Sequence, residues 1–139
     1  MRRFAWIIPF LAAILPAAAA APAPTAVILD CHDGDTCRLD REILPGRDRV
    51  RIANIDTPEL GDRAKCRAER MLAELARQAA AAHAGERVTL TAISPDKYAK
   101  RFDALVRLPD GRDLGQAQLD AGLALPWTGR RVDWCLPSP

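Results

Sequence analysis

Apolar and polar residues alternate along several short stretches of the chain, a pattern typical of half-buried β-strands. Two such stretches, residues 25–31 and 37–40, flank an Asp33-Gly34 pair, and this arrangement predicts a β-hairpin. Further alternating stretches predict strands at residues 49–55, 87–93 and 102–108.

Two other stretches repeat apolar residues at helical spacing. The longer one, residues 63–83, is followed by Gly85 as a C-cap, and the shorter one, residues 114–121, starts after Asp113 as an N-cap. The face of the longer helix expected to pack on the core carries Ala68, Met71, Leu72, Leu75, Ala76 and Ala79. The tail after residue 123 is expected to be irregular.

Three strands, a helix, two strands and a helix follow one another in the order of a small OB-type barrel. The expected fold class is therefore α+β, mainly β: a five-stranded OB-like barrel with one long and one short helix. The chain has 139 residues and no internal repeat or linker, so residues 25–135 are expected to form one domain.

The first 21 residues have the layout of a secretory signal peptide. Arg2 and Arg3 precede an apolar run over residues 5–15, and small residues at 17–21 offer cleavage sites near Ala19 or Ala21. The run is shorter than the roughly 20 residues that a membrane span needs. An exported protein, periplasmic or secreted and without a membrane attachment, is expected; an uncleaved N-terminal anchor is the alternative.

Removal of this leader changes the charge of the chain. The formal net charge of +2 comes from 20 basic and 18 acidic residues, and Arg2 and Arg3 are the only charged residues in the leader. The expected mature chain is thus formally neutral, so binding to nucleic acid would have to depend on local residues.

Four cysteines, an even number in a small exported chain, predict two disulfides with three possible connectivities. Cys31 and Cys37 are equally far from Gly34, so a hairpin can place them opposite each other. Cys66 opens the long helical region, and Cys135 can attach the tail to it. The expected pairs are therefore 31–37 and 66–135; the spacing of these cysteines and His32 is not a usual zinc pattern.

Polar clusters occur at three predicted strand ends: residues 33–36, residues 56–59, and residues 96–101. Each cluster alone is typical of an ordinary turn or a solvated loop. Arg51 is different, because its predicted strand is largely apolar on both faces. A guanidinium buried there requires an acceptor or a site.

Together these clusters resemble the staphylococcal (thermo)nuclease family. The matching segments are D-G-D-T at 33–36, V-R-I-A-N-I-D-T-P-E at 50–59, D-K-Y at 96–98 and D-G-R-D-L-G-Q-A-Q-L-D-A-G-L-A at 110–124. The likeness extends from about residue 27 to residue 127. It implies an OB-like barrel and a Ca²⁺-dependent phosphodiesterase, an endonuclease whose substrate is DNA, RNA or both. We expect a monomer.

The resemblance also implies roles for single residues. Those expected to bind calcium are Asp35 and Asp56 through their carboxylates and Thr57 through its backbone carbonyl, with Asp33 close by. Those expected to act in catalysis are Arg51, Glu59 and a second arginine. Those expected to contact the substrate are Lys97 and Tyr98.

The position of the second arginine departs from the family pattern, because Lys100 stands two residues after Tyr98 and Arg101 follows it. Counting back from Asp110-Gly111 places Arg101 in register instead. We expect Arg101 to fill the role, because its planar fork fits a phosphoryl group and a lysine is only a point charge.

These residue types also suit phosphodiester hydrolysis on chemical grounds, independently of the family resemblance. Carboxylates such as Asp35 and Asp56 are hard oxygen ligands for Ca²⁺, arginines neutralise charge on phosphoryl oxygens, and Glu59 can accept a proton from water. Trp127 either stacks on a base or caps the core. The alternative function is a catalytically silent OB module that binds nucleic acid or a protein.

Overall fold

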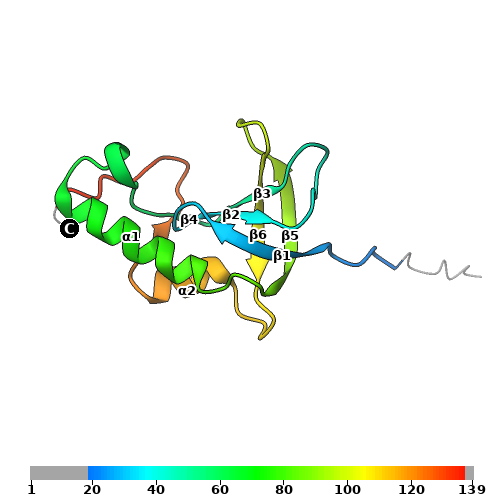
Figure 1. Cartoon of the computed structure of the whole chain (residues 1–139). Helices are drawn as coiled ribbons and strands as arrows, with labels where there is room; N and C mark the ends of the chain where they lie inside the picture. The colour runs from blue at the N-terminus through cyan, green and yellow to red at the C-terminus, as the bar shows by residue number, and fades with distance from the viewer. Residues whose placement is uncertain (1–18, 137–139) are drawn as a thin grey trace, which may run out of the picture.

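The computed structural model describes residues 19–136, so nearly all of the expected signal peptide lies outside the described residues. The predicted fold class is confirmed: the chain is α+β and mainly β, with a closed five-stranded barrel and two α-helices (Figure 1). The barrel strands are β1 (Thr25–Cys31), β2 (Thr36–Leu39), β3 (Arg49–Ile52), β5 (Arg87–Pro95) and β6 (Arg101–Arg107).

The strands close in the order β1-β2-β3-β6-β5. Neighbouring strands are antiparallel except β3 and β6, which run parallel with Arg49 opposite Arg101 and Arg51 opposite Asp103. The alternation predicted from the sequence fills the barrel with aliphatic side chains and one aromatic ring. The fully buried members include Ile28, Leu39, Val50, Ile52, Val88, Leu90, Phe102 and Val106.

The predicted third strand, residues 49–55, is interrupted. β3 ends at Ile52, residues 53–54 turn, and Ile55–Asp56 forms a separate strand, β4. β4 pairs with β7 (Leu125–Pro126), so the tail contains a short strand that the sequence did not predict. Asn54 holds the turn, because its Nδ2 donates to Asp113 Oδ1 at 3.1 Å and its carbonyl accepts from the N–H of Trp127 at 3.0 Å.

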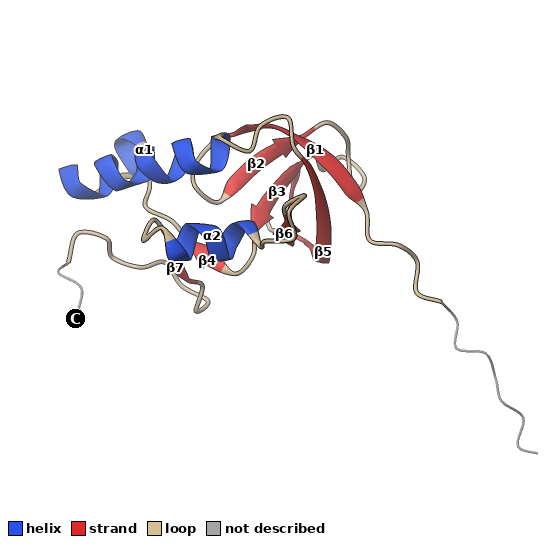
Figure 2. Ribbon diagram, turned by 90° about the horizontal axis from the view of Figure 1, so that it is seen from below, coloured by secondary structure: helices blue, strands red, loops and turns tan. Residues whose placement is uncertain are grey.

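The long helix is shorter than predicted. Helix α1 is Arg67–Ala81, with Cys66 as its N-cap, and the residues before it form a 3₁₀ turn, η1 (Gly61–Arg63). Helix α2 is Leu114–Asp120, with Asp113 as the predicted N-cap, whose side chain accepts from the N–H of Gln116. Both helices pack at one end of the barrel, beside β4 and β7 (Figure 2).

The predicted packing face of α1 is wrong in part: Ala76 is buried as predicted, but Ala68, Met71 and Leu75 are exposed. The buried residues are Glu69, Ala73, Ala76 and Ala80, whereas Met71 is 60% exposed and Leu75 is 52% exposed. The helix turns its small residues inward because it lies very close to the loop between β1 and β2. A Cβ on Gly34 would be only 2.6 Å from the Cβ of Ala76, which leaves no room for a leucine stripe.

Both predicted disulfides are present: Cys31–Cys37 links β1 to β2, and Cys66–Cys135 links the N-cap of α1 to the tail. Two disulfides are consistent with an oxidising, exported location. Within residues 19–136, no helix combines the length and the apolar character that a membrane crossing requires.

Candidate functional site

The loop between β1 and β2 carries the first carboxylates of the site. Gly34 lies between Asp33 and Asp35, and a side chain there would collide with Ala76 of α1 and with the Cγ2 of Thr57 at 2.9 Å. On the other side, Gln118 of α2 donates through Nε2 to the carbonyl of Gly34 at 3.0 Å. The loop is thus clamped between the two helices, and Asp35 is buried.

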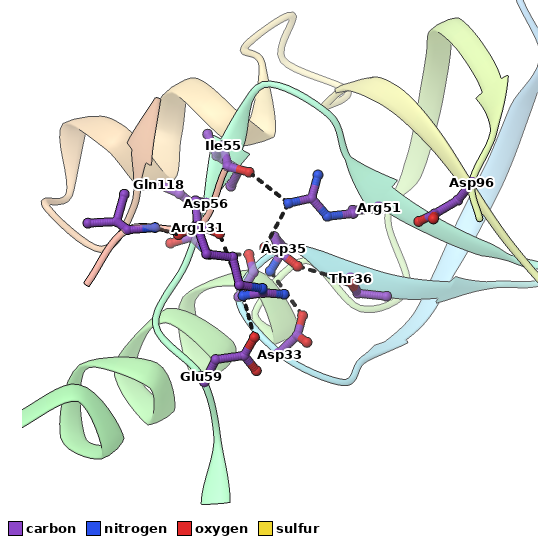
Figure 3. Close-up of polar contacts among 12 residues, drawn as sticks. Asp33, Asp35, Thr36, Arg51, Ile55, Asp56, Glu59, Asp96, Gln118 and Arg131 are labelled. Carbon is purple, nitrogen blue, oxygen red and sulfur yellow. Dashed lines mark hydrogen bonds and ion pairs between the residues drawn. The ribbon is translucent and has the colours of Figure 1, made fainter. Parts of the chain in front are cut away.

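Arg51 of β3 points toward this loop, and it is buried as predicted. Its Nη2 lies 3.8 Å from Asp35 Oδ2 and 3.4 Å from the carbonyl oxygen of Ile55 (Figure 3). The guanidinium carbon lies 4.7 Å from the centre of the Trp127 ring. The sequence left two possibilities for Trp127, and the structure places it 36% exposed beside Arg51.

Asp56 and Thr57 follow at the end of β4, and both are buried. Asp56 Oδ2 accepts hydrogen bonds from the backbone N–H of Val132 at 3.1 Å and from Trp134 Nε1 at 3.3 Å. Its other oxygen, Oδ1, is buried and accepts no hydrogen bond from the described residues; the nearest cationic group is Nη1 of Arg131 at 3.6 Å. A buried carboxylate oxygen of this kind fits a bound cation, because an unsatisfied charged acceptor is otherwise costly.

Glu59 lies between two arginines, Arg63 and Arg131, and Arg131 connects it to Asp56. Its Oε2 is 3.1 Å from Nε of Arg63, and its Oε1 contacts Nη1 of Arg131 (Figure 3). The backbone N–H of Glu59 donates to Oε1 of Glu69 at 3.2 Å. The buried carboxylate of Glu69 also accepts from the N–H of Lys65 at 2.7 Å, so it ties the Glu59 segment to the start of α1.

Arg101 rather than Lys100 faces the site. Arg101 starts β6, its Nε contacts Asp96 Oδ2, and its guanidinium carbon is 4.5 Å from the centre of the Tyr98 ring. Lys100 is exposed, has a positive φ of 66°, and lines neither of the two cavities at the site. Lys100 therefore occupies a turn with a left-handed backbone, a conformation that is uncommon for a residue with a side chain.

Two adjoining cavities, with volumes of about 340 Å³ and about 290 Å³, open beside the arginines of the site; Asp35, Asp56 and Glu59 are not among the residues that line them. Three residues line both: Tyr98, Arg101 and Arg131. The larger one is also lined by Arg51, Lys97, Asp103 and Trp127, and the smaller one by His32, Asp33, Arg49 and Arg63. The linings are rich in arginine, which favours an anionic ligand with phosphate groups.

Two carboxyl groups of the site have raised pKa values. Burial, followed by the negative charge of Asp35, raises the pKa of Asp33 to about 7. Asp33 also lies 3.9 Å from Nη2 of Arg63, which opposes the shift. Burial, followed by the charge of Asp96, also raises the pKa of Asp103. Below about pH 7 the site therefore carries less negative charge than its acidic residues suggest.

Among the described residues, one group of three metal-ligating side chains lies close enough together to hold an ion: Cys66, Glu69 and Cys135. Its two sulfurs are bonded to each other in a disulfide, so they offer no thiolate to a metal. Asp35 and Asp56 do not belong to such a three-ligand cluster. A cation there would need further oxygen ligands, such as the Thr57 carbonyl, water or a phosphate.

Comparison with protein-family models and with curated proteins finds no match to this chain. The likeness to a nuclease family therefore depends on the motifs quoted from the sequence. The structure does place the residues of those motifs together: Asp35, Arg51, Asp56 and Glu59 are linked to one another directly or through Arg131 and Ile55 (Figure 3).

Three contributors were missed from the sequence. Glu69 stands three residues after the N-cap of α1, a position where an acid often reaches back to free N–H groups, so a capping pattern could have indicated it. Arg131 and Trp134 gave no signal, because they lie in an irregular tail and reach the site only through its fold.

Proposed function

We propose that the protein is an exported, calcium-dependent nuclease of the staphylococcal nuclease type, which hydrolyses phosphodiester bonds in DNA, RNA or both. The observation that supports this most is the buried carboxylate of Asp56, whose Oδ1 accepts no hydrogen bond and lies 3.6 Å from Nη1 of Arg131, an arginine that lines both cavities. Such a site pairs a place for a hard cation with cationic groups for a phosphate. Its two disulfides suit an exported enzyme.

Asp35 and Asp56 would hold the cation, with the backbone carbonyl of Thr57 as a third ligand. When bound, Ca²⁺ would supply Lewis-acid polarisation of a phosphoryl oxygen and of water. Asp56 is suited to this task because Val132 and Trp134 fix Oδ2, whereas Oδ1 accepts no hydrogen bond and has only the ion pair with Arg131 at 3.6 Å.

Arg51 and Arg101 would neutralise the charge that grows on the phosphoryl oxygens as water attacks phosphorus. Arg51 is held by Asp35 and Ile55, and Arg101 by Asp96, so both guanidinium groups are preorganised. Glu59 would accept a proton from the attacking water while the P–O ester bond breaks and the leaving oxygen takes a proton from solvent. Lys97 and Tyr98, at the rim of the larger cavity, would contact the substrate.

The assignment can be tested by cleavage of denatured DNA with Ca²⁺ present. Glu59→Gln should lower kcat roughly 10²–10⁴-fold, the usual contribution of a general base. Arg101→Ala should lower it roughly 10²–10³-fold, the usual loss for a donor to developing negative charge. Lys100→Ala removes the same charge from the neighbouring exposed position and should have little effect.

Unchanged cleavage by Glu59→Gln would refute its role as base, and a larger loss for Lys100→Ala than for Arg101→Ala would refute the register chosen here. If the wild-type protein binds the DNA without cleaving it, the silent OB module is the correct function.

A further inference from the structure

The last described stretch of the tail, residues 127–136, lies across the candidate site. At its start, the N–H of Trp127 donates to the carbonyl of Asn54 at 3.0 Å, next to the pairing of β7 with β4. Near its end, Cys135 is bonded to Cys66, the N-cap of α1. These residues are thus attached at both ends, and Figure 1 shows them running from β7 to the start of α1.

Between these two attachments the tail contacts Asp56. The hydrogen bonds from Val132 and Trp134 hold Oδ2 of Asp56, while Nη1 of Arg131 lies 3.6 Å from Oδ1. The same nitrogen contacts Glu59. The tail therefore orients one carboxylate of the proposed cation site and brings a guanidinium between two of its acids.

Arg131 is placed differently from an arginine that serves only in a structural ion pair. Its side chain remains 50% exposed, and it lines both cavities at the junction where Arg101 also lies. A guanidinium has five donors in a rigid fork, so contacts with Glu59 and Asp56 leave donors available on the cavity side. A phosphate is the ligand that such a fork binds best.

The contacts of Arg131 with Asp56 and Glu59 compensate part of the negative charge of these two carboxylates. A cation held by Asp56 would take over that compensation, and Arg131 would then exchange a carboxylate partner for an anionic substrate. Charge balance in the site thus favours phosphate binding by Arg131 when the cation is present.

We propose that Arg131 is a further substrate-binding residue, which binds a phosphate group of the nucleic acid and is held in place by the Cys66–Cys135 disulfide. This inference rests on the nuclease function proposed above. It adds a third arginine to Arg51 and Arg101 from a segment outside every motif. It also couples substrate binding to oxidation, because a reduced tail loses its second attachment.

The test is equilibrium binding of a fluorescein-labelled eight-nucleotide thymidine strand, followed by fluorescence anisotropy in Ca²⁺. All variants carry Glu59→Gln so that turnover does not consume the strand. Arg131→Gln should weaken binding about tenfold, the value of one charge-assisted hydrogen bond. Arg130→Gln, which removes the same charge from the adjacent exposed residue, should change it less than about twofold.

The disulfide supplies a second arm. Cys66→Ser with Cys135→Ser should weaken binding about as much as Arg131→Gln, and adding Arg131→Gln to that pair should cause little further loss, since both changes remove one contact. Cys31→Ser with Cys37→Ser is the matched control and should retain binding. Circular dichroism checks that each variant is folded, and the Arg131→Gln arm decides the matter if the cysteine variant is not.

Equal affinities for Arg131→Gln and Arg130→Gln would overturn the inference. Tighter binding by Arg131→Gln would also overturn it, because the tail would then screen the site instead of serving it. Failure of the nuclease function is separate: wild-type protein that cleaves nothing, combined with a specific binding loss for Arg131→Gln, would refute catalysis and leave the phosphate contact standing.

Discussion

The acids of the site lie in different environments, and these environments decide what each can do. Asp56 is fixed through Oδ2 by two hydrogen bonds and pairs through Oδ1 with Arg131 alone, whereas Glu59 lies between Arg63 and Arg131. Asp33 is partly buried next to Asp35, and burial together with the charge of Asp35 disfavours ionisation of Asp33. The proposed cation would relieve the repulsion between these acids.

The titration of Asp33 predicts how stability depends on pH in the presence of a chelator. Burial and Asp35 raise its pKa from the ordinary 3.8 to about 7 in the folded protein. Between these values the folded state binds the proton more tightly than the unfolded state does. The free energy of unfolding should therefore fall as the pH rises from about 4 to about 7.

The measurement is urea unfolding of the wild type and of Asp33→Asn at pH 5 and pH 7.5 in EDTA. The difference in unfolding free energy between the two proteins isolates Asp33 from the other titrating groups. The wild type should lose stability relative to Asp33→Asn at the higher pH; parallel changes in the two proteins would contradict the raised pKa.

At the scale of elements, α1 supports the site by packing small residues against it. Ala76 lies against the Gly34 loop, and its carbonyl accepts from Gln118 Nε2 at 2.8 Å. Glu69, one turn into the helix, holds the N–H of Glu59. The helix and its partner α2 thus set the position of two acidic segments that come from different parts of the chain.

The packing of α1 predicts a contrast between adjacent positions. Ala76→Leu should lower the free energy of unfolding by about 1–3 kcal/mol or more, because its side chain would be driven into the Gly34 loop. Leu75→Gln changes an exposed residue and should stay within about 0.5 kcal/mol of the wild type.

Thermal and urea unfolding of the two variants measures this contrast. If Leu75→Gln proved the more destabilising of the two, the face predicted from the leucine pattern would be correct and the observed packing wrong.

Sequence periodicity was sufficient for the barrel, because β-strand alternation and turn residues are local signals. It failed for the packing face of α1. Leu72 and Leu75 recur at helical spacing and therefore indicate a core face, unless the close approach of Gly34 is known. The motif residues Arg51 and Asp56 could be placed in one site from the sequence. Arg131 could not, because its position depends on a disulfide and on the course of an irregular tail.

At the scale of the whole molecule, two disulfides and a balanced charge define the protein. Arg2 and Arg3 are the only charged residues outside residues 19–136, so the described part carries 18 basic and 18 acidic residues. The excess of cationic groups is therefore local to the linings of the two cavities and not a property of the whole molecule.

The two disulfides should contribute unequally to stability. In the chain-entropy description, the 69-residue separation of Cys66 and Cys135 corresponds to about 4 kcal/mol, and the 6-residue separation of Cys31 and Cys37 to about 2 kcal/mol. Urea unfolding of the two double serine variants measures both values. A larger loss for the 31–37 pair would show that strand pairing, and not loop closure, governs their effect.

Charge balance predicts a shallow dependence of activity on salt. If phosphate contacts are confined to Arg51, Arg101 and Arg131, the logarithm of kcat/KM should fall with the logarithm of salt concentration with a slope of about −2 on single strands. The measurement is cleavage at fixed Ca²⁺ over a series of potassium chloride concentrations. A slope as steep as about −5 would reveal long-range attraction that a neutral molecule does not supply.

The most direct test of the proposed nuclease is hydrolysis of heat-denatured DNA by the purified, disulfide-bonded protein, with Ca²⁺ and with EDTA. Release of acid-soluble nucleotides should occur with Ca²⁺ and stop when EDTA is added, because Asp35 and Asp56 then lack the cation that the chemistry requires. Absence of cleavage with Ca²⁺, or equal cleavage in EDTA, would contradict the proposal.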